Sequence, residues 1–344
     1  MKIRPVIAAL GATLLLASCS VSSGGSGEDE SGDNVIPQSG KVEDISEIVH
    51  ESMEGKKIGF VPVGLGIPLT EQWSTEIKRG FDQLGAEVVQ RDAGWDAAKM
   101  PDIIDSLINS DVDVLVLHNP DVGVLTSQIQ RAKQEGIYVV TLNMMPSQQS
   151  DAFLGGDFKA MAEELGNRVI KDCQAKGKTK VAAVDGFGTD GASVAAREGW
   201  NSVFEDSDIE VVSEQSANFL PGPASKVART VLQQHDDLCA FIGNFDTMML
   251  GVSEVVGQTG KSGNVGVYTI DASAPSCQNI KNGSLTVAVS YAVPAMGSAV
   301  VSTTQSLIES GSDPGSTRSV QFMPYELVDK SNVGDIAQAC YGTK

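Results

Sequence analysis

The sequence predicts an α/β protein made of two doubly wound lobes, each built on a parallel sheet. Strand-like and helix-like segments alternate along the chain, with a strand in roughly every 25 residues. The strand-like runs, such as 137–142, are apolar and β-branched on both faces, which is typical of buried parallel strands. After a polar break at 143–146 the same alternation begins again, and this repetition divides the chain into two lobes.

The first lobe is expected to begin near Lys56. Its strand candidates are residues 57–63, 86–91, 112–117 and 137–142. Between these strands, apolar residues recur at helical spacing and predict three helices. The stripes are Trp73, Ile77, Phe81 and Leu84; Met100, Ile103, Ile104 and Leu107; and Leu125, Ile129 and Ala132.

The second lobe is expected to begin with a helix that Asp157 caps and that carries Phe158, Ala162, Leu165 and Val169 at helical spacing. A short helix over 273–282 and a long one from Pro294 to about Ser310 follow, and residues 319–330 are extended. The strand candidates are 179–185, 209–215, 239–243, 264–270 and 285–290.

Ligands of open parallel sheets bind beyond the carboxyl ends of the strands. Two facing lobes of this kind therefore share one cleft, and the loops that follow the strands are the candidate binding loops.

The composition excludes two function classes. A net charge of −19 over 344 residues argues against a nucleic-acid partner, because phosphate binding needs a basic face. After residue 20 no apolar run approaches the roughly 18 residues that a transmembrane helix needs.

The N-terminus is typical of an exported protein. Lys2 and Arg4 precede an apolar run that ends in Leu16-Ala17-Ser18-Cys19, which resembles the bacterial lipobox. The resemblance implies a lipoprotein signal peptide over 1–18 and acylation of Cys19. The alternative is an ordinary signal peptide with an incidental cysteine. Residues 19–55, rich in Ser, Gly and acid at their start, are expected to be a flexible tether that attaches the protein to the membrane through lipid only.

Four cysteines follow Cys19. Because an exported chain with an even number of cysteines favours disulfides, two are expected, in one of three pairings. We favour Cys173–Cys239 and Cys277–Cys340. No cysteine or histidine spacing predicts a metal site, and no cofactor is expected.

Residues 186–191 form a literal GxGxxG after a strand and before a helix. As a dinucleotide loop it would serve an exported nucleotide-dependent enzyme. Export and the preceding Asp185 carboxylate argue against this interpretation, and a glycine-rich turn that closes onto a neutral ligand is favoured. No GxxxxGK[ST], GxSxG or HExxH is present.

Six stretches, in this order and spacing, resemble the ribose-type periplasmic sugar-binding proteins: KKIGFVPV, QWSTEIKRGF, VDVLVLHNP, GIYVVTLN, FIGNFDTMMLG and VGVYTIDAS. The resemblance covers about residues 56–330. It implies the type I periplasmic binding protein fold, with an N-terminal lobe of 56–155 plus 292–324 and a C-terminal lobe of 156–291 plus 325–344. It also implies a three-segment hinge at about 154–156, 291–293 and 323–326.

In the first lobe the resemblance assigns Trp73 to a ring that stacks on a sugar; the alternative is a core residue in the Ile77 and Phe81 stripe. Asn143 stands where the family commonly has Asp. Met144 replaces a frequent Arg, which removes a charged donor. Two residues at strand ends are candidates for the cleft rim, namely Trp95 and His118.

In the second lobe Asp271 ends a strand as the family's hydroxyl-binding aspartate does; the alternative is a helix N-cap, a role that Ser273 can fill. Arg197 is a ligand candidate or a partner in a surface salt bridge, and Phe219 is a second stacking ring or a loop-core residue. The remaining candidates are Asn244, Phe245 and Tyr291.

The expected function is that of an extracytoplasmic solute-binding protein of an ABC importer, lipid-anchored in the periplasm or at the cell surface. A monomer without enzymatic activity would bind a neutral monosaccharide or sugar alcohol and deliver it to a membrane permease. The alternatives are a sugar or furanosyl-signal receptor for a sensor system and, third, the exported enzyme that uses residues 186–191.

Overall fold

The computed structural model describes residues 41–335 and 340–342. The expected signal peptide, Cys19 and the tether up to residue 40 lie outside the described residues. Within the described part of the chain, no helix has both the length and the apolar character needed to cross a membrane.

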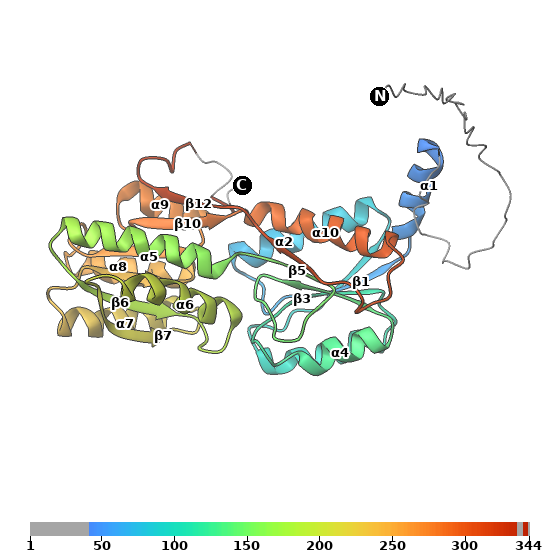
Figure 1. Cartoon of the computed structure of the whole chain (residues 1–344), viewed down its shortest axis with the longest axis horizontal. Coiled ribbons are helices and arrows are strands. Elements are labelled where there is room, and N and C mark those ends of the chain that lie inside the picture. The colour runs from blue at the N-terminus through green and yellow to red at the C-terminus, as the bar shows by residue number, and fades with distance from the viewer. Residues whose placement is uncertain (1–40, 336–339, 343–344) are drawn as a thin grey trace, which may run out of the picture. The chain divides into compact units, whose positions relative to one another are not determined.

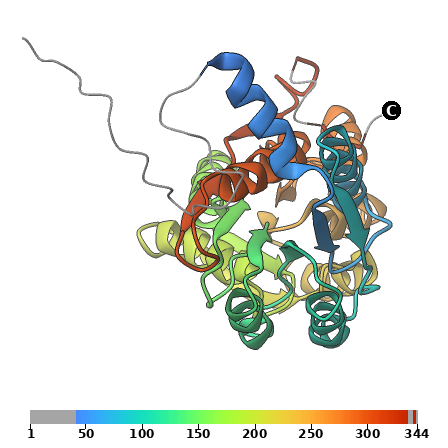
Figure 2. The same cartoon turned by 90° about the vertical axis from the view of Figure 1, so that its right-hand side faces the viewer.

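The tether prediction is wrong for its last part, because Val42–Met53 form a helix, α1. Its apolar residues Ile45, Ile48, Val49 and Met53 recur at helical spacing, and Met53 is fully buried. Figure 2 shows this blue helix beside the red helix α10 (Val293–Glu309), with which it is in contact. The folded region therefore starts before Lys56.

The first lobe is a six-stranded parallel sheet in the order β11-β5-β4-β3-β1-β2. Its strands are β1 (Lys57–Val61), β2 (Glu87–Gln90), β3 (Val114–His118), β4 (Tyr138–Leu142), β5 (Ala152–Gly155) and β11 (Ser319–Phe322). Strand β5 was not predicted. It has only four residues, and the polar stretch around it conceals a run that is buried throughout.

Helices cover both faces of this first sheet (Figure 1). On one face, α2 (Pro68–Gln83) and α10 pack their apolar stripes against the sheet. On the other face lie the single turn η1 (Ala97–Lys99), α3 (Met100–Ile108) and α4 (Thr126–Gln134). The stripes of α2, α3 and α4 are those that the sequence predicted, so the helical periodicity expected for these three helices is confirmed.

The second lobe is a six-stranded sheet in the order β12-β10-β9-β8-β6-β7. Its strands are parallel except β12, which runs antiparallel to β10. The strands are β6 (Lys180–Asp185), β7 (Glu210–Ser216), β8 (Ala240–Gly243), β9 (Gly266–Ile270), β10 (Val287–Tyr291) and β12 (Tyr325–Asp329). The helices are α5 (Phe158–Ala175), α6 (Gly191–Glu205), α7 (Pro221–Gln234), α8 (Asp246–Gln258) and α9 (Ala274–Asn282).

The chain passes between the two sheets three times: from β5 to α5, from β10 to α10, and from β11 to β12. Asp157 caps α5 as predicted, its carboxylate accepting the Ala160 N–H. The predicted fold class, two doubly wound lobes joined by three segments, is confirmed.

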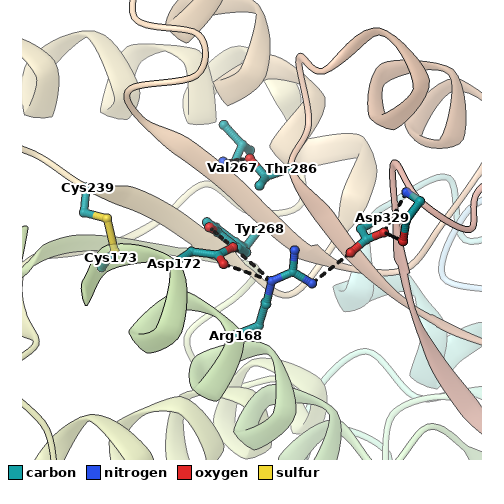
Figure 3. Close-up of polar contacts among 9 residues, drawn as sticks. Arg168, Asp172, Cys173, Cys239, Val267, Tyr268, Thr286 and Asp329 are labelled. Carbon is teal, nitrogen blue, oxygen red and sulfur yellow. Dashed lines mark hydrogen bonds and ion pairs between the residues drawn. A yellow bond between two sulfur atoms is a disulfide. The ribbon is translucent and has the colours of Figure 1, made fainter. Parts of the chain in front are cut away.

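Two disulfides staple the second lobe, and both expected pairings are confirmed. Cys173–Cys239 joins α5 to the residue before β8. Beside it, the Arg168 guanidinium donates to Asp172 at 3.0 Å and to Asp329 at 2.9 Å, and the Tyr268 hydroxyl donates to the same Asp172 oxygen (Figure 3). This network ties α5 to β9 and β12 within the second lobe.

Candidate functional site

A cavity lies where the carboxyl ends of the two parallel sheets face each other. Its volume is about 30 Å³, well below the roughly 300–1,000 Å³ of small-molecule sites, so the lobes or lining side chains must move to admit a ligand. Both lobes supply its walls. The lining residues are Ile67, Leu69, Trp95, His118, Asn143 and Met144 from the first, and Phe158, Ala192, Phe219, Asn244, Phe245, Asp271 and Tyr291 from the second.

The topology brings the polar lining residues together. His118 ends β3, Asn143 follows β4, and Tyr291 ends β10. Asn244 and Asp271 directly follow β8 and β9. Since parallel strands end at the same edge of a sheet, residues far apart in sequence meet at one place.

The backbone around the cavity is strained. Six non-glycine residues in the described part of the chain have positive φ, and four of them line the cavity: Trp95 (64°), Asn143 (66°), Phe219 (60°) and Asp271 (82°). Bulky side chains such as Trp and Phe rarely adopt this region. Strain of this kind costs about 1–3 kcal/mol per residue and concentrates at functional sites, so this cavity is the candidate functional site.

Aromatic rings form much of the wall. The Phe219 ring makes edge contacts with Phe187 at 5.4 Å and with Phe245 at 5.6 Å. Across the cavity, Phe158 and Tyr291 meet in the same geometry at 5.7 Å. These edge contacts pack the rings against one another, so a large part of the cavity wall is aromatic and apolar.

Asp271 supplies the carboxyl group of the cavity lining. It is 2% exposed, and its Oδ1 accepts the Ala272 N–H at 3.0 Å. No described residue forms a hydrogen bond of normal geometry with its Oδ2. Burial, followed by the charge of nearby Asp246, raises the pKa of Asp271 well above its ordinary value, while the Tyr341 hydroxyl and the Ala272 N–H oppose that rise.

Other buried polar atoms also lack partners among the described residues. Asn244 donates through Nδ2 to the Ser193 hydroxyl at 2.9 Å, but its Oδ1 is unpaired. Both ring nitrogens of His118 are unpaired, and burial lowers the pKa of this imidazole to about 3, so it is neutral. A buried polar atom without a partner is costly, so these atoms favour a ligand that can hydrogen-bond to them.

Six of the residues predicted from the sequence line this cavity, and so do both rim candidates. The six are Asn143, Phe219, Asn244, Phe245, Asp271 and Tyr291. Asn143 and Tyr291 are joined directly, since the Tyr291 hydroxyl donates to Asn143 Oδ1 at 2.9 Å. This hydrogen bond joins the loop after β4 in the first lobe to the last residue of β10 in the second lobe.

Two predicted residues do not reach the cavity. Trp73 is fully buried behind His118, with the ring centroids 5.2 Å apart, because its stripe with Ile77 and Phe81 points into the core. Arg197 instead pairs with Asp185 at 2.6 Å and Glu214 at 3.2 Å, which draws its guanidinium away. The geometry therefore agrees with the second interpretation of each residue: Trp73 is a core residue, and Arg197 is a partner in a salt bridge.

The sequence did not identify every lining residue. Ile67 and Leu69 flank Pro68 at the start of α2, and neither was a candidate from the sequence. The sequence assigns Phe158 to the helix core, and it packs there and also lines the cavity. Tyr341 lies beside the loop that carries Asp271, where it forms a β-bridge with Ser273. In the sequence, the neighbouring Cys340 with its expected disulfide to Cys277 was the feature that could have placed Tyr341 there.

Close packing explains two of the three glycines in residues 186–191, whereas a Cβ built on Gly188 would meet nothing within 4 Å. A Cβ built on Gly186 would lie 2.0 Å from the Phe219 ring, and one on Gly191 would lie 2.7 Å from the Met145 carbonyl oxygen of the other lobe. Asp190 caps α6 by accepting the Ser193 N–H at 2.8 Å. At Gly191 this turn therefore packs closely against the first lobe. In the described residues no cluster of His, Cys, Asp or Glu is arranged to hold a metal ion.

Comparison with known proteins agrees with this architecture. The family model described as a periplasmic binding protein domain matches residues 58–312. A ribose import binding protein of Bacillus subtilis is 27% identical over 69% of this chain and 78% of its own length.

Two solved structures share the fold. An ABC transporter solute-binding protein from Agrobacterium vitis, bound with α-D-tagatopyranose, has a TM-score of 0.76 and 18% identity, over 84% of this chain and 100% of that one. One from Bacillus halodurans, with bound myo-inositol, has a TM-score of 0.74 and 23% identity, over 82% of this chain and 97% of that one. The chain therefore belongs to the periplasmic binding protein domain family.

Proposed function

We propose that this protein is the extracytoplasmic solute-binding protein of an ABC importer and that it binds a neutral monosaccharide or sugar alcohol between its lobes. One observation carries the proposal. A cavity with aromatic walls also presents buried acceptor oxygens that lack partners among the described residues, on Asp271 and Asn244.

This combination suits a polyhydroxy ligand. Ring faces contact the C–H groups of a sugar, while hydroxyl groups donate to Asp271 Oδ2 and Asn244 Oδ1. A hydrogen bond to the charged carboxylate contributes about 1.5–3 kcal/mol, more than one to a neutral group. No Lys or Arg is among the lining residues, which disfavours an anionic ligand such as a sugar phosphate.

Transport requires that the cavity open and close. The ligand would bind one lobe while the cavity is open, and the three hinge segments would then let the other lobe close over it. The membrane permease would recognise the closed form. The relatives support the ligand class, since their names mention ribose, tagatose and myo-inositol.

The remaining features of the proposal come from the sequence. A signal peptide over 1–18 and acylation of Cys19 would place the protein outside the cytoplasm, attached to the membrane by lipid. It would act as a monomer and catalyse no reaction.

A thermal-shift screen of the purified protein tests this function. The panel is D-ribose, D-allose, D-xylose, D-tagatose and myo-inositol, each at millimolar concentration. A sugar that binds only the folded protein, present at 100 times its Kd, adds about 2.7 kcal/mol to the free energy of unfolding, and at least one panel member should therefore raise Tm by several degrees. If no member shifts Tm, the proposed ligand class is wrong.

A further inference from the structure

Two loops of the second lobe carry the acceptor oxygens that line the cavity. The loop after β8 carries Asn244, and the loop after β9 carries Asp271. One oxygen of each side chain lacks a partner among the described residues. A sugar can meet both oxygens at once only when the two loops keep a fixed separation. A group that joins the loops would therefore pre-organise the site.

Asp246 joins these two loops. It is the first residue of α8, two residues after Asn244, and its side chain is fully buried. Its Oδ2 accepts the Ser273 N–H at 2.6 Å and the Ser276 hydroxyl at 2.7 Å. Ser273 lies two residues after Asp271. The hydrogen bonds of Asp246 therefore run from the first turn of α8 to the end of the loop that carries Asp271.

The starts of two helices hold this carboxylate. Asp246 begins α8, while Ser273 is the N-cap residue of α9 and Ser276 lies in the first turn of α9. The N-terminus of a helix carries partial positive charge and N–H groups without partners in the helix, and both stabilise a carboxylate. Neutral donors can therefore keep Asp246 in one orientation.

The loop after β9 needs this support. Asp271 lies in the left-handed region at φ 82°, which residues other than glycine rarely adopt. Burial, followed by the charge of Asp246, raises the pKa of Asp271, so the two carboxyl groups disfavour each other's ionisation. The loop thus combines backbone strain with a like-charge contact, and the hydrogen bonds that end at Ser273 and Ser276 offset both.

We propose that Asp246 is a positioning residue for ligand binding: by holding Ser273 and Ser276, its carboxylate fixes the loop that carries Asp271 relative to Asn244. The inference rests on the proposed function, because it assumes that the sugar contacts Asn244 and Asp271. The hydrogen bonds of Asp246 lie within the second lobe, however, and can be measured without a sugar.

Three variants separate positioning from stability. Asp246→Ala removes both acceptor oxygens, whereas Asp246→Asn keeps one oxygen that can accept the same two hydrogen bonds. Asp151→Ala is the matched control, because Asp151 is also fully buried and its carboxylate accepts the Val139 N–H at 2.8 Å and the Thr317 hydroxyl at 3.3 Å. Asp151 directly precedes β5, so it lies at the amino end of the first sheet, opposite the end that lines the cavity.

The first test measures amide hydrogen exchange in the sugar-free protein. The Ser273 amide should exchange at least about tenfold faster in Asp246→Ala than in the wild type, because its acceptor is gone. In Asp246→Asn and Asp151→Ala it should exchange as in the wild type. Unchanged exchange of the Ser273 amide in Asp246→Ala overturns the proposal.

The second test is calorimetric titration with D-ribose, or with the panel sugar that raises Tm most. Asp246→Ala should bind about tenfold more weakly than the wild type. Asp246→Asn should restore the affinity, and Asp151→Ala should bind normally even though it also loses buried hydrogen bonds. If Asp246→Ala does not fold, Ser276→Ala takes its place; it removes one of the two donors and should bind about threefold more weakly.

Three calorimetric results overturn the proposal. They are unchanged affinity in Asp246→Ala, or in Ser276→Ala where that variant replaces it; an equal loss of affinity in Asp151→Ala; and no recovery in Asp246→Asn. If no panel sugar binds the wild type, the proposed function fails, and the exchange of the Ser273 amide alone decides whether Asp246 fixes the loop.

Discussion

Replacing Asp271 with Asn tests the site most sharply, because the structure predicts opposite effects on binding and on stability. Asn keeps the size of the side chain and tolerates the left-handed backbone at φ 82° better than most residues do. The substitution removes the charge and replaces one acceptor oxygen by an NH2 donor, with almost no change in shape. It therefore separates the role of the carboxylate from packing and backbone strain.

The loss of affinity follows from hydrogen-bond energies. A bond to a charged acceptor contributes about 1.5–3 kcal/mol and one to a neutral acceptor about 0.5–1.5 kcal/mol, so Asp271→Asn should cost about 1–2 kcal/mol of binding. Asp271→Ala, which removes both oxygens, should cost at least about 2 kcal/mol. Both values are measured by isothermal titration with the best sugar of the panel.

Stability should change in the other direction. Burial and Asp246 raise the pKa of Asp271, so the ionised carboxyl destabilises the folded protein, and this penalty grows as the pH rises through the folded-state pKa. Urea unfolding of the sugar-free protein at high pH should show Asp271→Asn to be more stable than the wild type. Unchanged affinity would remove Asp271 from the site. A joint fall of affinity and stability would mean that the carboxylate holds the fold together.

Three further predictions concern other parts of the molecule. Burial raises the pKa of Asp190 to about 6, so the free energy of unfolding of the wild type should fall as the pH rises from about 4 to about 6. Asp190→Asn keeps the α6 cap but has no carboxyl to ionise. In urea unfolding above pH 6, this variant should be more stable than the wild type by on the order of 2 kcal/mol. Equal pH profiles would contradict this. Cys173→Ala/Cys239→Ala opens a loop of 66 residues and should cost about 4 kcal/mol in urea unfolding, and a loss below about 1 kcal/mol would show that the disulfide adds little. Trp73→Phe should leave sugar affinity unchanged in calorimetry, because the indole does not line the cavity; a tenfold loss would return Trp73 to the site.

The sequence predicts the framework of this protein well because periodicity is a local property. Strands that are apolar on both faces and helices with one apolar stripe can be recognised without knowledge of their partners. The same local logic places Asn143, Asn244 and Asp271 at strand ends, and parallel topology then brings them together.

The errors occur where a distant partner decides the outcome. Arg197 is drawn from the cavity by Asp185 on β6 and Glu214 on β7, a choice that no local pattern encodes. Trp73 lies in the first turns of α2, where a stripe residue can face either the cavity or the core, and His118 occupies the place between it and the cavity. Strand β5 and helix α1 were missed because polar or Ser/Gly-rich neighbours conceal their short apolar patterns.

A crystal structure of the protein grown with the panel sugar that binds most tightly tests the central claim most directly. The sugar ring should lie between the lobes, with its C–H face on Phe219 or Phe245 and a hydroxyl on Asp271 Oδ2. The cavity should also be larger than the present 30 Å³. A sugar bound outside this cavity, or one inside it that does not touch Asp271, would contradict the account.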